Sequence, residues 1–167
     1  VEQLTTAQVV ALTSAQVAAM QVADVAALSD TQLIALTTSQ AAALTGAQVA
    51  ALSGANIASL ETADIAALST AAIASLTTGQ ITSLLDAQVA ALTTVQIRAL
   101  ETVDVKAMSL DQLIALSSDQ VSALTTEQFA ALSPAQQAAA QNGETVDGAE
   151  VILALTTASV VALDPSV

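Results

Sequence analysis

The sequence predicts an all-α solenoid of very short helices, with one helix in each eight-residue repeat. Leucine or methionine recurs every eight residues from Leu4 to Leu132 without a slip, which gives seventeen repeats, or octads. The consensus octad reads Leu-Thr-Thr-x-Gln-Val-x-Ala, and its places are counted from the leucine as first to eighth. A short fixed period of this kind is typical of solenoid and fibrous proteins.

Neither a continuous helix nor strands fit this period. In one long α-helix the leucine stripe would drift by about 80° per octad, so no single partner could bury it. The alanine content, the lack of strict alternation and the scarcity of aromatic residues argue against strands. The remaining interpretation is a short helix in every octad, ended by a sharp turn.

The second and fifth places of the octad carry a helix start signal. A second-place Thr or Ser followed three residues later by Gln is the capping box, in which the two residues satisfy each other's first-turn N–H groups. Pro134 stands at the first helical position, where its missing N–H costs nothing. Arg98 and Lys106 stand in seventh place, near the negative end of the helix dipole. The predicted caps include Thr13, Ser29, Thr45, Thr93 and Ser133.

Helices this short are not stable alone, so neighbouring octads are expected to share one core. We expect the first-place Leu, the sixth-place Val or Ile and the eighth-place Ala to face it. About two octads are expected per coil, paired as helical hairpins, with three as the alternative. The predicted core includes Leu12, Leu28, Leu44, Leu60, Leu76, Leu92, Leu116, Val49, Ile65 and Ile97.

The chain is interpreted as one domain over residues 1–167. The regular array covers 4–139, the phase breaks over 140–149 around the turn signal Gln141-Asn142-Gly143, and the repeat resumes over 150–167. Both ends of the sequence fall inside an octad. This favours either a fragment of a longer array or subunits that complete one another head to tail.

A forty-residue period is superimposed on the eight-residue period. In the regular array, Asp fills the fifth place at Asp24, Asp64 and Asp104 alone, with Gln or Glu in place of the second-place hydroxyl. Our interpretation is that the carboxylate accepts the first-turn N–H groups that the lost cap leaves free. Duplication of a forty-residue unit, a superhelical pitch or lateral contact at every fifth octad, and a weak Ca²⁺ site are three readings of the recurrence. The Ca²⁺ candidates are Glu61, Asp64, Glu101 and Asp104, although a hard cation prefers more oxygens than each pair offers.

The composition argues against several classes of function. The chain has no Cys, His, Trp or Tyr, which leaves few of the residues that catalysis and metal binding use, so we expect no enzyme and no cofactor. A net charge of −13 disfavours nucleic acid and anionic membrane surfaces. Polar residues interrupt every apolar run before it reaches the length of a membrane span, so no membrane insertion is expected.

The stretch Leu44-Thr45-Gly46-Ala47-Gln48-Val49-Ala50-Ala51 and its neighbours resemble octad arrays of very large secreted or surface proteins of Gram-negative bacteria, described as adhesin-like. The resemblance implies an extracellular or cell-surface location and a structural role as a rod, stalk or self-assembling filament subunit. Self-association, head to tail or lateral, is the expected partnership. A solenoid module that binds a protein or glycan is the alternative, with Ca²⁺-dependent assembly and ice binding as minor ones.

Overall fold

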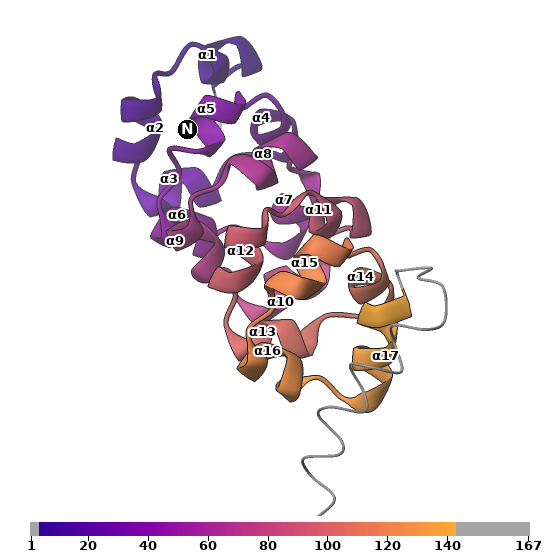
Figure 1. Cartoon of the computed structure of the whole chain (residues 1–167). Helices are drawn as coiled ribbons and strands as arrows, with labels where there is room; N and C mark the ends of the chain where they lie inside the picture. Colours follow the sequence, from indigo (N-terminus) through magenta and orange to yellow (C-terminus); the bar gives the residue numbers. More distant parts are fainter. Residues whose placement is uncertain (1–3, 143–167) are drawn as a thin grey trace, which may run out of the picture.

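The computed structural model describes residues 4–142, which form a coil of short helices without a strand (Figure 1). The helices contain four to nine residues each. Each octad supplies one helix, as its start signal predicts. The helices are α1 (Thr6–Val10), α2 (Ser14–Ala19), α3 (Val22–Ala26), α4 (Asp30–Ile34), α5 (Thr38–Ala41), α6 (Gly46–Ala50), α7 (Gly54–Ser59), α8 (Thr62–Ala67), α9 (Thr70–Ala74), α10 (Thr78–Ser83), α11 (Asp86–Ala91), α12 (Thr94–Ala99), α13 (Thr102–Ala107), α14 (Leu110–Ile114), α15 (Ser118–Ala123), α16 (Thr126–Ala131) and α17 (Pro134–Asn142).

Reciprocal side-chain bonds start most of the helices. Before α12, the Gln96 N–H donates to the Thr93 hydroxyl at 3.2 Å, and the Thr93 N–H donates to Gln96 Oε1 at 2.7 Å. Ser133 and Gln136 make the same pair of bonds before α17. These bonds satisfy N–H groups that a helix start otherwise leaves without partners. The same capping box stands at Thr13, Ser29 and Thr45.

The corners between helices are made of extended residues and need no glycine. After α12, Leu100 has φ −62° and ψ 140°, and Glu101 has φ −68° and ψ 149°. Between residues 4 and 142 no residue has a positive φ. The helices therefore end without the left-handed glycine that commonly closes a helix, which fits the low count of five glycines in the whole sequence.

The helices stack three octads apart. Helix α1 packs on α4, α2 on α5, and so on up to α14 on α17. Figure 1 shows the chain winding from α1 at one end of the molecule to the region of α17 at the other. Side-chain hydrogen bonds also join many helix ends to the octad four further on, as from Gln40 in α5 to Leu12 after α1. One turn of the coil therefore contains between three and four octads.

The expectation of about two octads per coil, paired as hairpins, is wrong. None of the main packing pairs among the described helices consists of two consecutive helices. A six-residue helix has fewer than two turns, and the extended corner directs the next helix away from it. The chain comes back alongside an earlier helix only after three corners.

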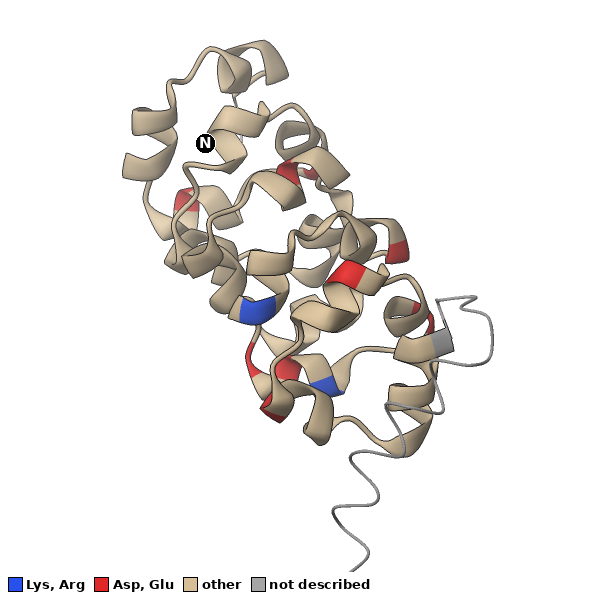
Figure 2. Cartoon of the chain, viewed as in Figure 1, with Lys and Arg blue, Asp and Glu red and all other residues tan. Residues whose placement is uncertain are grey.

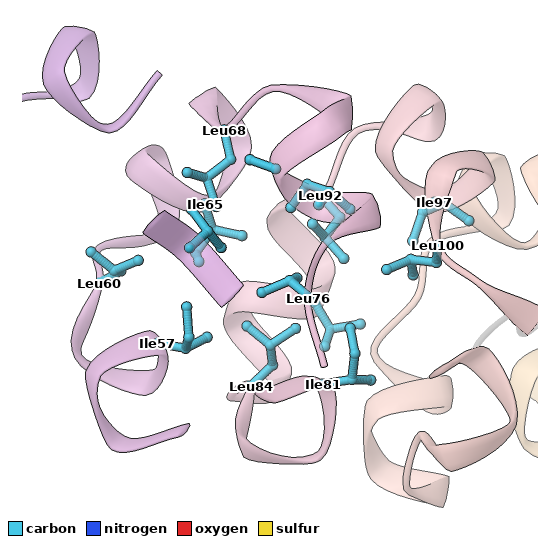
Figure 3. Packing of buried hydrophobic residues seen from close by; sticks show 14 of the residues in the cluster. Ile57, Leu60, Ile65, Leu68, Leu76, Ile81, Leu84, Leu92, Ile97 and Leu100 are labelled. Atoms are coloured by element: carbon cyan, nitrogen blue, oxygen red, sulfur yellow. The ribbon is translucent and has the colours of Figure 1, made fainter. Parts of the chain in front are cut away.

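The core is formed by the first and sixth places, whose side chains point into the interior (Figure 3). Among the predicted core residues, Leu12 is half-buried, because it lies in the first turn of the coil. Nine others are buried: Leu28, Leu44, Leu60, Leu76, Leu92, Leu116, Val49, Ile65 and Ile97.

The eighth-place alanines take only part of the place in the core that the sequence suggested: Ala123 and Ala139 are buried in it, but most of the others are not. Ala51 is exposed and Ala67 is half-buried. The fifth place lies inside instead. Nine glutamines in fifth place, from Gln32 to Gln128, are each at most 4% exposed.

The last described helix is longer than an octad allows. Helix α17 continues to Asn142, past the first-place position of Ala140, so the predicted turn does not begin at Gln141. Alanine favours the helix, and no hydroxyl follows Ala140 to start a new one. The rest of the predicted phase break and the resumed repeat at 150–167 lie outside the described residues.

Candidate functional site

The fifth-place glutamines join successive turns of the coil. Gln40 Nε2 donates to the carbonyls of Val9, at 2.8 Å, and Leu12, at 2.7 Å, which lie 31 and 28 residues earlier. Its Oε1 meanwhile accepts from the Thr37 N–H at 2.8 Å. We call the set of such residues the glutamine ladder. Both offsets recur at Gln48, Gln80, Gln88, Gln96, Gln112, Gln120 and Gln128.

The glutamine ladder provides hydrogen-bond donors for buried carbonyls at the ends of helices. The last carbonyls of a helix have no partner inside it, and buried carbonyls without partners are costly. Each glutamine amide supplies donors to these carbonyls from the turn above. Each such bond contributes on the order of 1 kcal/mol to stability.

Sequence reasoning assigned the glutamines to capping alone and missed this second contact. The octad of Leu85 contained a signal for it. Leu85 has no hydroxyl, yet Gln88 is retained in fifth place. In the structure Gln88 Nε2 donates to the carbonyls of Ile57 and Leu60. A glutamine kept where its capping partner is lost indicates a second role.

Shorter fifth-place side chains contact a different turn. Asn56 Nδ2 donates to Asp30 Oδ1 at 3.0 Å, and the Thr78 hydroxyl donates to Asp104 Oδ1 at 2.8 Å. Both partners lie 26 residues earlier, in the third place of the octad three copies back. Because Asn and Asp are one methylene shorter than Gln, side-chain length selects the partner.

This contact corrects the interpretation that the fifth-place Asp caps its own helix. Glu101, the N-cap of α13, makes no side-chain capping bond, and the Asp104 carboxylate accepts from Thr78 of α10. Asp104 is 3% exposed, because its side chain turns inward against the preceding turn of the coil. Thr38 stands in the same relation to Asp64, forty residues earlier. The forty-residue period therefore conserves an Asp and Thr pair between turns.

Asp64 has an unusual electrostatic environment. Its side chain is 2% exposed, and Oδ2 is buried without a hydrogen-bond partner. Burial raises the pKa of this carboxyl above its ordinary value, the Thr38 hydroxyl lowers it, and the negative charge of Glu61 raises it. Asp24, which holds the same place in the first turn of the coil, is half-buried.

The four Ca²⁺ candidates fall into two separate pairs. Asp64 lies in α8 and Glu61 is its N-cap residue, whereas Asp104 lies in α13 and Glu101 is its N-cap residue. In each pair the glutamate is exposed and the aspartate is buried. Within residues 4–142 no three acidic side chains gather into a group that could hold a metal ion. The structure thus brings each aspartate to a threonine hydroxyl rather than to a set of carboxylates.

A shallow hollow on the surface lies between α12 and α15. Thr94, Val95, Arg98, Asp119, Ser122 and Ala123 line it. Arg98 Nε donates to the Ala123 carbonyl at 3.2 Å, so the seventh-place arginine also satisfies a helix end. Figure 2 shows the acidic residues spread along the coil, with few basic residues among them. No helix of the described part is both long enough and apolar enough to cross a membrane.

A family model described as the ALTTAQ repeat matches residues 17–54, 57–94 and 97–134. These matches cover more than half of the chain. The chain belongs to the ALTTAQ repeat family. Successive ALTTAQ matches begin forty residues apart, which is the period of the Asp and Thr pairs, so the family unit corresponds to five octads. Neither a curated protein nor a solved structure matches the chain.

Proposed function

We propose that this ALTTAQ repeat array is a structural protein without enzymatic activity. In this proposal it acts outside the cell or at its surface, as a rod, a stalk or the subunit of a filament with an adhesive or matrix role. The observation that carries the proposal is the glutamine ladder. The glutamines of the ladder make the same contacts from turn to turn, so an added octad with a fifth-place glutamine lengthens the coil without a new kind of contact.

The composition of the chain supports a structural role. The sequence has no His or Cys, and its net charge of −13 disfavours association with nucleic acid or anionic lipid. Charged residues are spread along the coil, as Figure 2 shows, rather than gathered in one place. Such a surface keeps a long array in solution.

The first turn of the coil supports self-association. Gln16 is exposed, and its Oε1 caps Thr13 as in the inner octads. In those inner octads the fifth-place glutamine also donates to the carbonyls at the end of a helix in the preceding turn of the coil. The amide of such an exposed glutamine is a donor that suits helix-end carbonyls of another copy of the array. Copies are therefore proposed to join end to end.

Electron microscopy of the purified chain over a range of concentrations tests this proposal. We expect particles that join end to end and lengthen as the concentration rises. The double variant Gln8→Glu and Gln16→Glu should remain single, because its carboxylates repel the carbonyls that the amides would bind. Isolated particles of the unmodified chain at every concentration would contradict the filament proposal. The helical circular dichroism signal of the variant is compared with that of the parent. Equal signals show that the variant retains the fold.

A further inference from the structure

The glutamine ladder is interrupted at α8, where Asp64 occupies the fifth place. A glutamine there would donate to the carbonyls 31 and 28 residues earlier, which are those of Leu33 and Leu36 at the end of α4. An ionised aspartate has no hydrogen to donate and can only accept. Its negative charge is buried, and it lies beside the negative charge of Glu61, which is unfavourable.

The hydrogen-bond geometry leaves one oxygen of this carboxyl without a partner. The Thr38 hydroxyl, on α5, donates a hydrogen bond to the Asp64 carboxyl, as the Thr78 hydroxyl does to Asp104. Oδ2 remains buried without a partner. A proton on Oδ2 converts it from an acceptor into a donor. The neutral carboxyl thereby regains the donor character that glutamine has at this place.

The groups around Asp64 supply no positive charge. Helix α8 packs on α5 and α11. Glu61 is the nearest charged group on its own octad, α5 has no titratable residue, and α11 carries Asp86. Asp30, on α4, is also acidic, and its carboxylate accepts a hydrogen bond from the Asn56 amide. Every charged group on the elements packed against Asp64 is therefore negative, which favours proton uptake.

We propose that Asp64 is a proton-controlled joint of the coil. When its carboxyl is neutral, the turn that joins α5 to α8 is held firmly. When the carboxyl is ionised, the unpartnered charge weakens that turn more than any turn closed by glutamine. Acid tightens the array at this octad, and neutral or alkaline conditions loosen it.

The direction of the pH dependence follows from linkage. Since burial raises the pKa of Asp64 in the folded chain above its unfolded value, the folded chain binds the proton more tightly. The contribution of this proton to stability is complete below the unfolded pKa of about 3.9 and is lost as the pH rises through the folded pKa.

The variant Asp64→Asn removes the titration and keeps an acceptor for Thr38. We expect its melting temperature to match that of the parent at about pH 3 and to exceed it by about 3 °C or more at about pH 8. The matched control is Asp24→Asn. It makes the same change in the fifth place of another octad, at an aspartate that is half-buried. The pH dependence measured for this control is the reference for the one measured for Asp64→Asn. Carboxyl ¹³C shifts of the whole chain report the titration of Asp64 directly, with no variant.

Three results would overturn the proposal. One is a carboxyl of Asp64 that titrates at or below its unfolded value. The second is a stability difference for Asp64→Asn with the same pH dependence as the one for Asp24→Asn. The third is stabilisation of the parent, but not of Asp64→Asn, by added Ca²⁺ at about pH 8. That result would show that a metal ion rather than a proton fills this place.

Discussion

The fifth-place amide combines two contacts in one side chain. Gln96 Oε1 accepts from the Thr93 N–H, while Nε2 donates to the carbonyls of Ile65 and Leu68. The donor and the acceptor face opposite partners, and the amide is the neutral group that offers both. Glutamate would lose the donor. Asparagine, as Asn56 shows, turns toward the third place of an earlier octad.

The variant Gln96→Glu separates these two contacts. Its carboxylate keeps the acceptor for Thr93, but it places a buried negative charge against carbonyls that have lost their donor. We expect it to lower the free energy of unfolding by about 3 kcal/mol at neutral pH. Urea denaturation measures this loss.

Gln16→Glu is the matched control for that variant. Gln16 caps Thr13 by the same bond, but it is exposed in the first turn. We expect a change within about 0.5 kcal/mol. Equal losses in the two variants would show that capping, and not the bond between turns, dominates the role of the glutamine.

Part of this residue chemistry was readable from the sequence and part was not. The capping boxes follow from the spacing of Thr13 and Gln16, because both partners lie in one octad. The donor contact of Gln40 lies 28 to 31 residues away, so its partner depends on the number of octads in a coil. No local pattern specifies that number.

At the level of the helix, a hydroxyl cap stabilises the start of most elements. Helix α11 lacks it, because Leu85 stands in second place. The Leu85 N–H still donates to Gln88 Oε1 at 2.9 Å, but no hydroxyl accepts from the first turn. Leu85 is 56% exposed, so little apolar burial would be lost if it were replaced.

Leu85→Thr should therefore stabilise the chain. A hydroxyl in this place completes the capping box of α11 and is expected to raise the free energy of unfolding by about 1 kcal/mol. Leu110→Thr is the control, because Leu110 is also exposed but stands in third place, after the Ser109 cap. Thermal melts compare the two, and a gain for Leu110→Thr as large as that for Leu85→Thr would contradict the capping argument.

The sequence predicted the helices but not the angles between them. The eight-residue spacing of Leu60 and Leu68 excludes a continuous helix, and the hydroxyls locate the starts. The direction of each new helix depends on two extended residues, such as Leu100 and Glu101. Their backbone angles lie in a broad region that most residues adopt, so the residue types at the corner do not specify its angle.

For the molecule as a whole, contacts between octads three and four apart make neighbouring octads interdependent. Helix α9 touches α6 and α12, and each of these has partners of its own. A short helix without its neighbours is not stable. Damage to one central octad is therefore expected to spread to adjacent turns, whereas the ends of the coil should be less affected.

Leu76→Asp tests this interdependence. Leu76 is 4% exposed, and a carboxylate in its place would lie unpaired in the core. We expect a loss of more than about 4 kcal/mol, with hydrogen exchange protection lost in the helices around α9 and α10.

Arg98→Ala is the comparison for this variant. It removes one surface bond to the Ala123 carbonyl and should cost less than about 1 kcal/mol. Equal melting curves for Leu76→Asp and Arg98→Ala would show that the inward and outward places have been assigned wrongly.

The reach of the hydrogen bonds between turns also bears on how such an array changes length in evolution. Ladder bonds extend back by at most 31 residues, and the Asp and Thr pairs recur every forty. Unequal crossing-over that adds or deletes one forty-residue block rejoins corresponding octads, so an Asp and Thr pair and most of the ladder contacts at the junction find partners of the same kind. A gene of this kind can vary in copy number while each product remains well packed.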